Sequence, residues 1–154
     1  MTLGTPFSVV ILAAGKGTRM RSRLHKVLHK VAGHPMLLHL LDTVDALGAT
    51  RRVVVVGDGR EQVEAALTGR DVAVAVQEPQ RGTAHAVQQA REALAGFDGN
   101  VLILYGDTPF VEAATLEEML GRLGGDDGPA AIVLASSPGR LTRIACEKLA
   151  PLLE

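Results

Sequence analysis

Hydrophobic and polar residues alternate in blocks along this chain, and each block has the length of one strand or one helix. Uninterrupted apolar runs predict five strands, over residues 8–13, 52–56, 72–76, 100–105 and 130–135. Four helices are predicted between them, over residues 35–48, 61–67, 83–94 and 115–123. Strands that are apolar throughout and alternate with helices are typical of an α/β protein. We therefore expect a mostly parallel sheet with helices on both faces.

Composition agrees with this class of fold. The chain has 154 residues, which suits one ordinary domain, and it is 47% hydrophobic but only 3% aromatic. Its net charge of −1 provides no field that would attract nucleic acid or a membrane surface. The single cysteine, Cys146, excludes an internal disulfide and suits a reducing compartment. Neither a membrane-spanning stretch nor a signal peptide is recognisable, so we expect a cytoplasmic protein.

Three polar or glycine-rich segments follow predicted strands directly. They are residues 15–19, 77–83 and 105–109, after the first, third and fourth strands. Because ligands of open parallel sheets bind at the carboxyl ends of the strands, the three segments are candidates for one shared site.

The first of these segments, Gly15-Lys16-Gly17-Thr18-Arg19, has the composition of a phosphate-binding loop. It is too compact for the P-loop, and Met20 stands where the dinucleotide fingerprint requires a third glycine. Glycine admits an anion close to backbone N–H groups, and Arg19 offers a bidentate charged contact. A polyphosphate ligand is therefore favoured over a glycine-rich turn with solvated basic side chains.

Two further positions carry candidate chemistry. Lys26 is placed to reach back over the same site. His25 and His29 are spaced like zinc ligands on a helix, but we interpret them as packing or surface residues. The zinc motif needs a glutamate where Lys26 stands. Asp107 ends the fourth strand and suits a Mg²⁺ ligand, but a turn-forming aspartate fits equally well.

Four segments together resemble one family. LAAGKGTRM (12–20), LHKVLHKVAGHPML (24–37), QEPQRGTAHAV (77–87) and LYGDTPF (104–110) are similar to the N-terminal pyrophosphorylase domain of the bifunctional GlmU family. Members of that family join an N-acetylglucosamine-1-phosphate uridylyltransferase to a glucosamine-1-phosphate acetyltransferase. The resemblance covers roughly residues 7–135 in the family's order and spacing. It implies a Rossmann-like fold of the nucleotide-diphospho-sugar transferase type.

The resemblance also implies roles for individual residues. Catalytic contacts to the triphosphate come from Arg19 and Lys26. Backbone groups that line the nucleotide belong to Leu12, Ala13, Ala14 and Gly15. The uracil is read by Gln77, Gly82 and Thr83. The sugar phosphate is bordered by Tyr105, Gly106 and Asp107, and Asp107 becomes a Mg²⁺ ligand.

The implied reaction needs no general base. An oxygen of N-acetylglucosamine-1-phosphate attacks the α-phosphorus of UTP in line, and pyrophosphate leaves. The nucleophile is already ionised, so the protein only has to position two anions and neutralise charge. The product, UDP-N-acetylglucosamine, serves peptidoglycan and lipopolysaccharide synthesis.

The chain departs from the family in two places. Leu24-His25-Lys26 stands where the family usually has Leu-Pro-Lys. The family's domain is also longer, and its further part carries the sugar-facing residues and an asparagine that is the second magnesium ligand. We therefore expect an incomplete nucleotide-binding domain over residues 1–135. A divergent helical tail over residues 136–154 would cover the exposed surface or pack against a second copy in a homo-oligomer.

Two alternatives stay open at this stage. One is a nucleotidyltransferase for another sugar phosphate or for the molybdenum cofactor. The other is a nucleotide-binding module without catalysis, which the lack of a second metal ligand in this chain favours. On either view the chain can be weakly active or inactive by itself.

Overall fold

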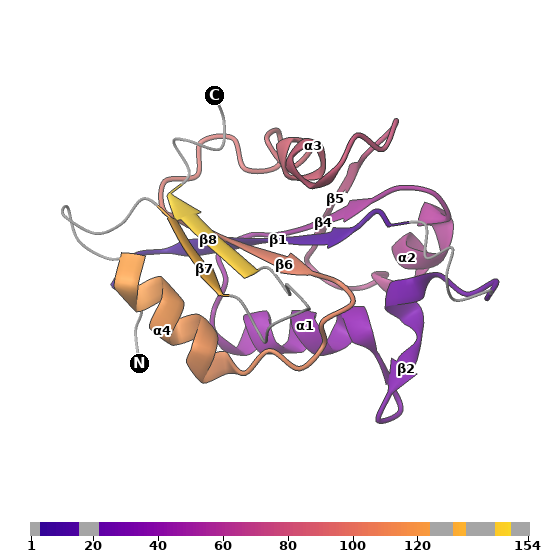
Figure 1. Cartoon of the computed structure of the whole chain (residues 1–154), viewed down its shortest axis with the longest axis horizontal. Helices are drawn as coiled ribbons and strands as arrows, with labels where there is room; N and C mark the ends of the chain where they lie inside the picture. Colours follow the sequence, from indigo (N-terminus) through magenta and orange to yellow (C-terminus); the bar gives the residue numbers. More distant parts are fainter. Residues whose placement is uncertain (1–3, 16–21, 124–130, 135–143, 149–154) are drawn as a thin grey trace.

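A computed structural model describes residues 4–15, 22–123, 131–134 and 144–148 of the chain (Figure 1). The described strands are β1 (Phe7–Ala13), β2 (Lys30–Val31), β3 (His34–Pro35), β4 (Arg52–Val56), β5 (Ala73–Val76), β6 (Asn100–Tyr105), β7 (Ala131–Leu134) and β8 (Ile144–Lys148). The described helices are the 3-10 helix η2 (Lys26–Leu28) and the α-helices α1 (Met36–Ala46), α2 (Arg60–Ala66), α3 (Thr83–Gln88) and α4 (Ala113–Leu123).

Six of the described strands form the central sheet in the order β5-β4-β1-β6-β8-β7. β1 lies in the middle of its parallel part, where Val10 pairs with Val53 of β4 on one side and with Ile103 of β6 on the other. Such β-branched residues suit a strand that is buried on both faces. The predicted α/β fold with a mostly parallel sheet is confirmed.

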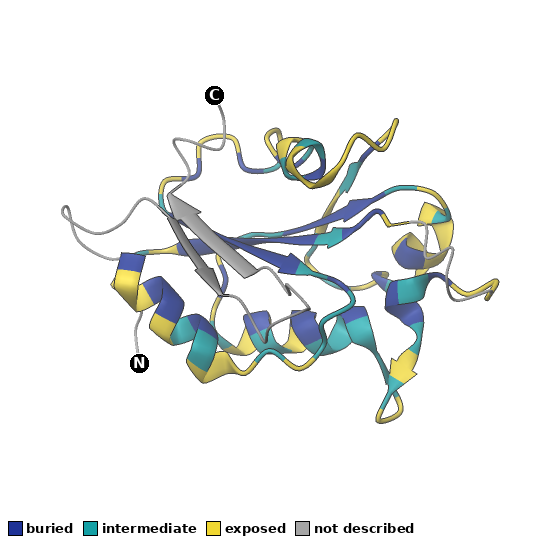
Figure 2. Cartoon of the chain, viewed as in Figure 1, coloured by how far each residue is buried: buried dark blue, intermediate teal, exposed yellow. Residues whose placement is uncertain are grey.

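Helices cover both faces of the sheet, and most of β1, β4 and β6 is buried between them (Figures 1 and 2). Alternate residues of β1 supply the two cores. Val9 and Ile11 pack in the core that α1, α2 and α4 cover. Val10 packs in the opposite core, under α3 and the turns that follow it. Strand geometry sends successive side chains to opposite faces, which explains the division.

α1 shows how local sequence forms these elements. Pro35 occupies its N-cap position, and the buried side chains of Leu37, Leu41 and Val44 recur at helical spacing on the face toward the sheet. The helix ends before Gly48, whose φ of 77° is readily adopted only by glycine.

Two predicted helices differ from the structure. α3 ends at Gln88 rather than at residue 94, because the chain continues in turns with i→i+3 hydrogen bonds such as Ala90 N–H to the Val87 carbonyl. These turns still bury Ala90 and Leu94 against the sheet.

The helix predicted for the tail is wrong over Ile144–Lys148, which forms β8. β8 pairs with β6 in antiparallel register, Leu102 opposite Cys146, and continues the sheet beyond β6. Strand pairing here occupies the backbone hydrogen-bonding groups along that side of β6, and this non-local gain outweighs a helical pattern of apolar residues. Residues 136–143 and 149–154 of the predicted tail lie outside the described part.

A small hairpin was not predicted. β2 and β3 pair in antiparallel register, with Val31 opposite His34. Between them, Ala32 and Gly33 both have positive φ, 51° and 82°, as a two-residue hairpin turn of type I′ requires. Strands of two residues are too short to produce a readable alternation of apolar and polar residues.

Within the described residues no helix is long and apolar enough to cross a membrane.

Candidate nucleotide-binding site

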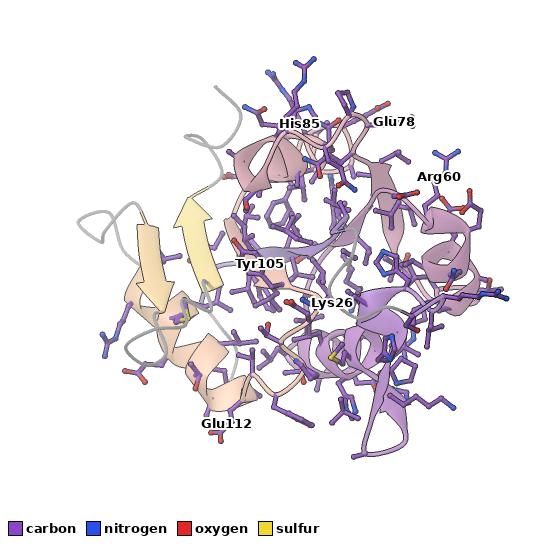
Figure 3. All side chains as sticks on the ribbon, turned by 45° about the vertical axis from the view of Figure 1, so that its right-hand side comes forward. Lys26, Arg60, Glu78, His85, Tyr105 and Glu112 are labelled. Atoms are coloured by element: carbon purple, nitrogen blue, oxygen red, sulfur yellow. The ribbon has the colours of Figure 1, made fainter. Side chains whose placement is uncertain are left out.

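A cavity of about 540 Å³ opens at the carboxyl ends of β1, β5 and β6. It also receives residues of η2 and of the beginning of α3. Its lining consists of Leu12, Ala13, Ala14, Gly15, Lys26, Val27, Gln77, Gln80, Gly82, Thr83, Ala86, Tyr105 and Asp107. In Figure 3, Lys26 and Tyr105 lie near the centre of the view, and His85 lies on α3 above them.

The structure therefore brings together most of the residues that the sequence singled out. Ten of them line this one cavity, although they come from three separate segments of the chain and from Lys26. Gly106 is close by but is not part of the lining. Its N–H donates a hydrogen bond of 2.9 Å to the Leu12 carbonyl, and thus ties the end of β6 to the end of β1. Arg19 lies outside the described residues.

Lys26 and Asp107 form an ion pair on the wall of the cavity. Lys26 Nζ donates to Asp107 Oδ2 at 2.5 Å, and the two side chains are 39% and 34% exposed. One cationic and one anionic group therefore face the same space while water still reaches both of them. This is the arrangement expected where a phosphate and a cation share one site.

The position of Lys26 is fixed by the packing of η2, the short helix in which it lies. Val27 and Leu28, the other two residues of η2, are buried in the core. The segment in front of η2 is held by Gln62 of α2, whose Oε1 accepts from His25 N–H at 2.9 Å. Gln62 Nε2 donates in turn to the Arg23 carbonyl at 3.0 Å. One amide side chain thus fastens two backbone groups next to Lys26.

His25 is a packing residue. The sequence had left open whether it packs in the interior or lies at the surface. Its side chain is buried, and neither ring nitrogen has a hydrogen-bond partner within the described residues. Burial lowers the pKa of His25 below the ordinary value of 6.5, and the nearby Asp58 carboxylate opposes this shift only in part. The ring is therefore neutral at pH 7 and carries no charge into the site.

The far side of the cavity is built around Gln77. This residue is only 4% exposed, and its backbone N–H donates to the Val56 carbonyl at 2.8 Å, extending the pairing of β5 with β4. Its side-chain Nε2 donates to the Gly82 carbonyl at 2.8 Å. Gly82 is the N-cap residue of α3 and has a φ of 99°, a backbone conformation that favours glycine. Gln77 and Gly82 therefore join β5 to the beginning of α3.

Gln80 was missed in the sequence analysis as a site residue. It lines the cavity, and its Nε2 donates to the Ala14 carbonyl, so it closes the gap between the turns after β5 and β1. Gly57 leaves room for it, because a Cβ at that position would lie 2.6 Å from Gln80 Nε2 and 2.9 Å from the Ala14 oxygen. The position of Gln80 between two predicted site residues, Gln77 and Gly82, was the sequence signal that could have identified it.

Strands that end at a cavity with glycine turns, a lysine and a carboxylate define a nucleotide-binding α/β domain. The model of the MobA-like NTP transferase domain family matches residues 9–154. The chain belongs to this family. The match includes residues 136–154, where we expected the family pattern to stop.

Closely similar relatives are longer proteins. The chain is 62% identical over 136 residues to the bifunctional protein GlmU of Sphingopyxis alaskensis, covering 88% of this chain and 30% of that protein. It is 50% identical over 155 residues to the bifunctional protein GlmU of Zymomonas mobilis, covering 97% of this chain and 34% of that protein. The chain thus spans about a third of the length of the curated relatives that it matches.

Solved structures share the fold. A nucleotidyl transferase from Methanothermobacter thermautotroptrophicus is 27% identical with a TM-score of 0.76, over 96% of this chain and 73% of that one. Rv0371c from Mycobacterium tuberculosis, in its complex with manganese, is 20% identical with a TM-score of 0.72, over 97% of this chain and 75% of that one.

Proposed function

We propose that this chain is the UTP-binding part of an N-acetylglucosamine-1-phosphate uridylyltransferase. The reaction joins UTP and N-acetylglucosamine-1-phosphate to UDP-N-acetylglucosamine and releases pyrophosphate. One observation carries the proposal. The turns after three parallel strands meet Lys26 in a single cavity, in a chain that is 62% identical to part of a GlmU protein. We assign the nucleotide-binding unit to residues 1–135 and its place of action to the cytoplasm.

The residues of the cavity suit in-line phosphoryl transfer. The attacking oxygen belongs to an ionised phosphate, so the site needs no residue that removes a proton. It has to hold two anions close together and to stabilise charge that moves to the leaving pyrophosphate. In our assignment Lys26 performs this work from the cavity wall, and Arg19 performs it from the basic segment after β1. Leu12, Ala13, Ala14 and Gly15 would contribute backbone groups beneath the nucleotide.

Asp107 is suited to be one ligand of a divalent cation whose other ligands come from the substrate phosphates and water. Its carboxylate is a hard oxygen donor, is 34% exposed, and faces the cavity. Among the described residues, no group of three or more His, Cys, Asp or Glu side chains is arranged to hold a metal ion. Mg²⁺ is commonly held by one or two carboxylates together with substrate phosphates and water, which is the shell that Asp107 can enter. When bound, the ion would offset the negative charge of the phosphates.

The two ends of the cavity are assigned to the two ends of the ligand. Gln77 directly follows β5, and Gly82 and Thr83 lie at the beginning of α3. These three residues would hold the uracil. Tyr105 and Asp107 lie at the end of β6 and would border the sugar phosphate, with Gly106 shaping the turn between them. Because the chain spans about a third of its GlmU relatives, we expect it to bind UTP better than it turns it over.

Nucleotide binding by the 154-residue chain tests this proposal. Thermal unfolding would be followed with UTP, CTP, GTP or dTTP, each with and without Mg²⁺. We expect the largest stabilisation from UTP with Mg²⁺, since a ligand that binds only the folded state raises its stability. Stabilisation by GTP or CTP without any by UTP would overturn the assignment and favour a different nucleotidyltransferase.

Pyrophosphate release with UTP and N-acetylglucosamine-1-phosphate tests the reaction itself. Turnover that disappears in an Arg19→Ala variant would support the assigned mechanism, whereas unchanged kinetics in that variant would remove Arg19 from it. Binding of UTP without turnover, also at high sugar phosphate, would leave UTP binding in place but would show that this chain does not catalyse the reaction by itself.

A further inference from the structure

The side-chain amide of Gln77 contacts two groups with the same atom. Nε2 lies 2.8 Å from the Gly82 carbonyl oxygen and 3.1 Å from Nδ1 of His85 on α3. A carbonyl oxygen can only accept a hydrogen bond, so this end of the amide must be the NH₂ group. An NH₂ group has two hydrogens, and these two contacts use both of them.

We propose that His85 is a positioning residue for nucleotide selection. By accepting the second N–H of Gln77, it leaves Oε1 as the only free hydrogen-bonding group of that amide in the cavity. The inference rests on the proposed function, in which Gln77 reads the base of UTP. It adds that the selectivity of Gln77 depends on a residue that does not line the cavity.

The chemistry of the imidazole ring decides whether His85 can do this. Gln89 Nε2 lies 3.2 Å from His85 Nε2 and also donates to the His85 backbone carbonyl at 2.9 Å. Both ring nitrogens therefore face an NH₂ group, yet a neutral imidazole has only one acceptor nitrogen. The two glutamines compete for one hydrogen bond.

Burial resolves this competition in favour of Gln77. Gln77 is 4% exposed, and an unpaired N–H there would lose its hydrogen bonds to water without replacement. Gln89 is only half-buried on the same helix and can pair with water instead. The structure thus assigns the ring proton of His85 to Nε2 and leaves Nδ1 as the acceptor for Gln77.

The consequence is a preference among bases. Uracil presents an N–H at its N3 position and can donate it to Gln77 Oε1. Cytosine presents an unprotonated nitrogen at that position and needs a donor, but both N–H groups of Gln77 are occupied. Removing the acceptor on His85 would release one of them and make cytosine acceptable.

Two variants of the full chain separate this role from packing. His85→Leu removes the acceptor at similar size, whereas His85→Asn keeps an acceptor oxygen close to the place of Nδ1. Dissociation constants for UTP and CTP with Mg²⁺ would be measured by calorimetry. We expect His85→Leu to lower the preference for UTP over CTP roughly tenfold, the effect of one unpaired buried N–H. His85→Asn should restore most of the preference, and Gln89→Leu should retain it.

The outcomes distinguish this inference from the proposed function. If the wild-type chain shows no preference for UTP, the proposed function fails. If the wild type prefers UTP and His85→Leu keeps the same ratio, or weakens both nucleotides equally, the positioning role is overturned while the function stands. Nitrogen chemical shifts of His85 in the unaltered chain provide a second readout. An unprotonated Nδ1 supports the inference, and a protonated Nδ1 overturns it.

Discussion

Lys26 Nζ lies 2.5 Å from Asp107 Oδ2, although 81 positions separate the two residues in the chain. The pair joins η2 to the turn after β6, on the wall of the cavity. In the proposed function both groups act on one ligand, Lys26 on phosphate and Asp107 on a cation. Ligand binding must therefore replace their mutual contact by two contacts to the ligand, and this exchange can be tested one group at a time.

Asp107→Asn should separate nucleotide binding from its dependence on metal. The change removes a negative charge near the phosphates and frees Lys26, so UTP binding without Mg²⁺ should be retained or become tighter. The gain in affinity that Mg²⁺ provides should disappear. UTP titrations with and without Mg²⁺ measure both effects, and Asp98→Asn, at an exposed position outside the cavity lining, is the control. A Mg²⁺ dependence equal to that of the wild type would contradict the metal assignment.

Lys26→Met should weaken UTP binding and suppress turnover. Removing one preorganised charged donor costs about 2.7–4 kcal/mol of transition-state stabilisation, or about 10²–10³ in rate. Lys30→Met is the matched control, because Lys30 is exposed on β2 and does not line the cavity. Equal effects of the two variants on the pyrophosphate-release rate would show that only overall charge matters.

Gln62→Leu should loosen the segment in front of Lys26. The variant removes an acceptor for His25 N–H and a donor for the Arg23 carbonyl, each worth about 1 kcal/mol or less at this degree of exposure. Amide hydrogen exchange at His25 should become faster, and UTP affinity should fall without loss of the fold. Glu64→Leu, on the same helix and also exposed, should do neither. Unchanged exchange at His25 would show that Gln62 does not hold this segment.

Gly106→Ala should destabilise the chain at the edge of the site. The new Cβ would lie 2.9 Å from Val27 Cγ1 and 3.1 Å from the Leu12 carbonyl oxygen, which forces the end of β6 away from β1. We expect a loss of about 1–3 kcal/mol in the free energy of unfolding, measured with urea. Gly121→Ala in α4 is the opposite case, since within the described residues no atom beyond its own helix turns lies within 4 Å of the added Cβ. This variant should stabilise the chain by about 0.5–1 kcal/mol. A neutral Gly106→Ala would mean that the turn adapts without strain.

Stability should decrease when the pH falls below the ordinary pKa of histidine. Burial lowers the pKa of His25 in the folded chain below 6.5, so the unfolded chain takes up a proton first. The free energy of unfolding therefore falls as the pH drops through 6.5, and the loss is complete below the folded pKa. Urea titrations at several values between neutral and mildly acidic pH measure the slope. His25→Leu should reduce this slope, and a slope equal to that of the wild type would contradict the assignment.

The class of fold and most of the predicted site residues could be read from the sequence. Continuous apolar runs are a local signal. The strands β1 and β6 could therefore be predicted without knowing which strands they pair with. Polar segments directly after such strands meet at one edge of a parallel sheet for topological reasons. The order of strands and polar segments along the chain, together with the family resemblance, was therefore enough to place ten residues at one cavity.

The hydrogen-bond and ion-pair partners of these residues follow from how the elements pack, not from any local pattern. The contacts of Lys26 with Asp107 and of Gln62 with His25 join residues far apart in the chain, so no local pattern contains them. The formation of the strand β8 in place of the predicted helix has the same cause, because β8 makes its hydrogen bonds to the distant strand β6. Local pattern sets where elements begin and what they bury, whereas pairing between distant groups depends on how the elements pack together.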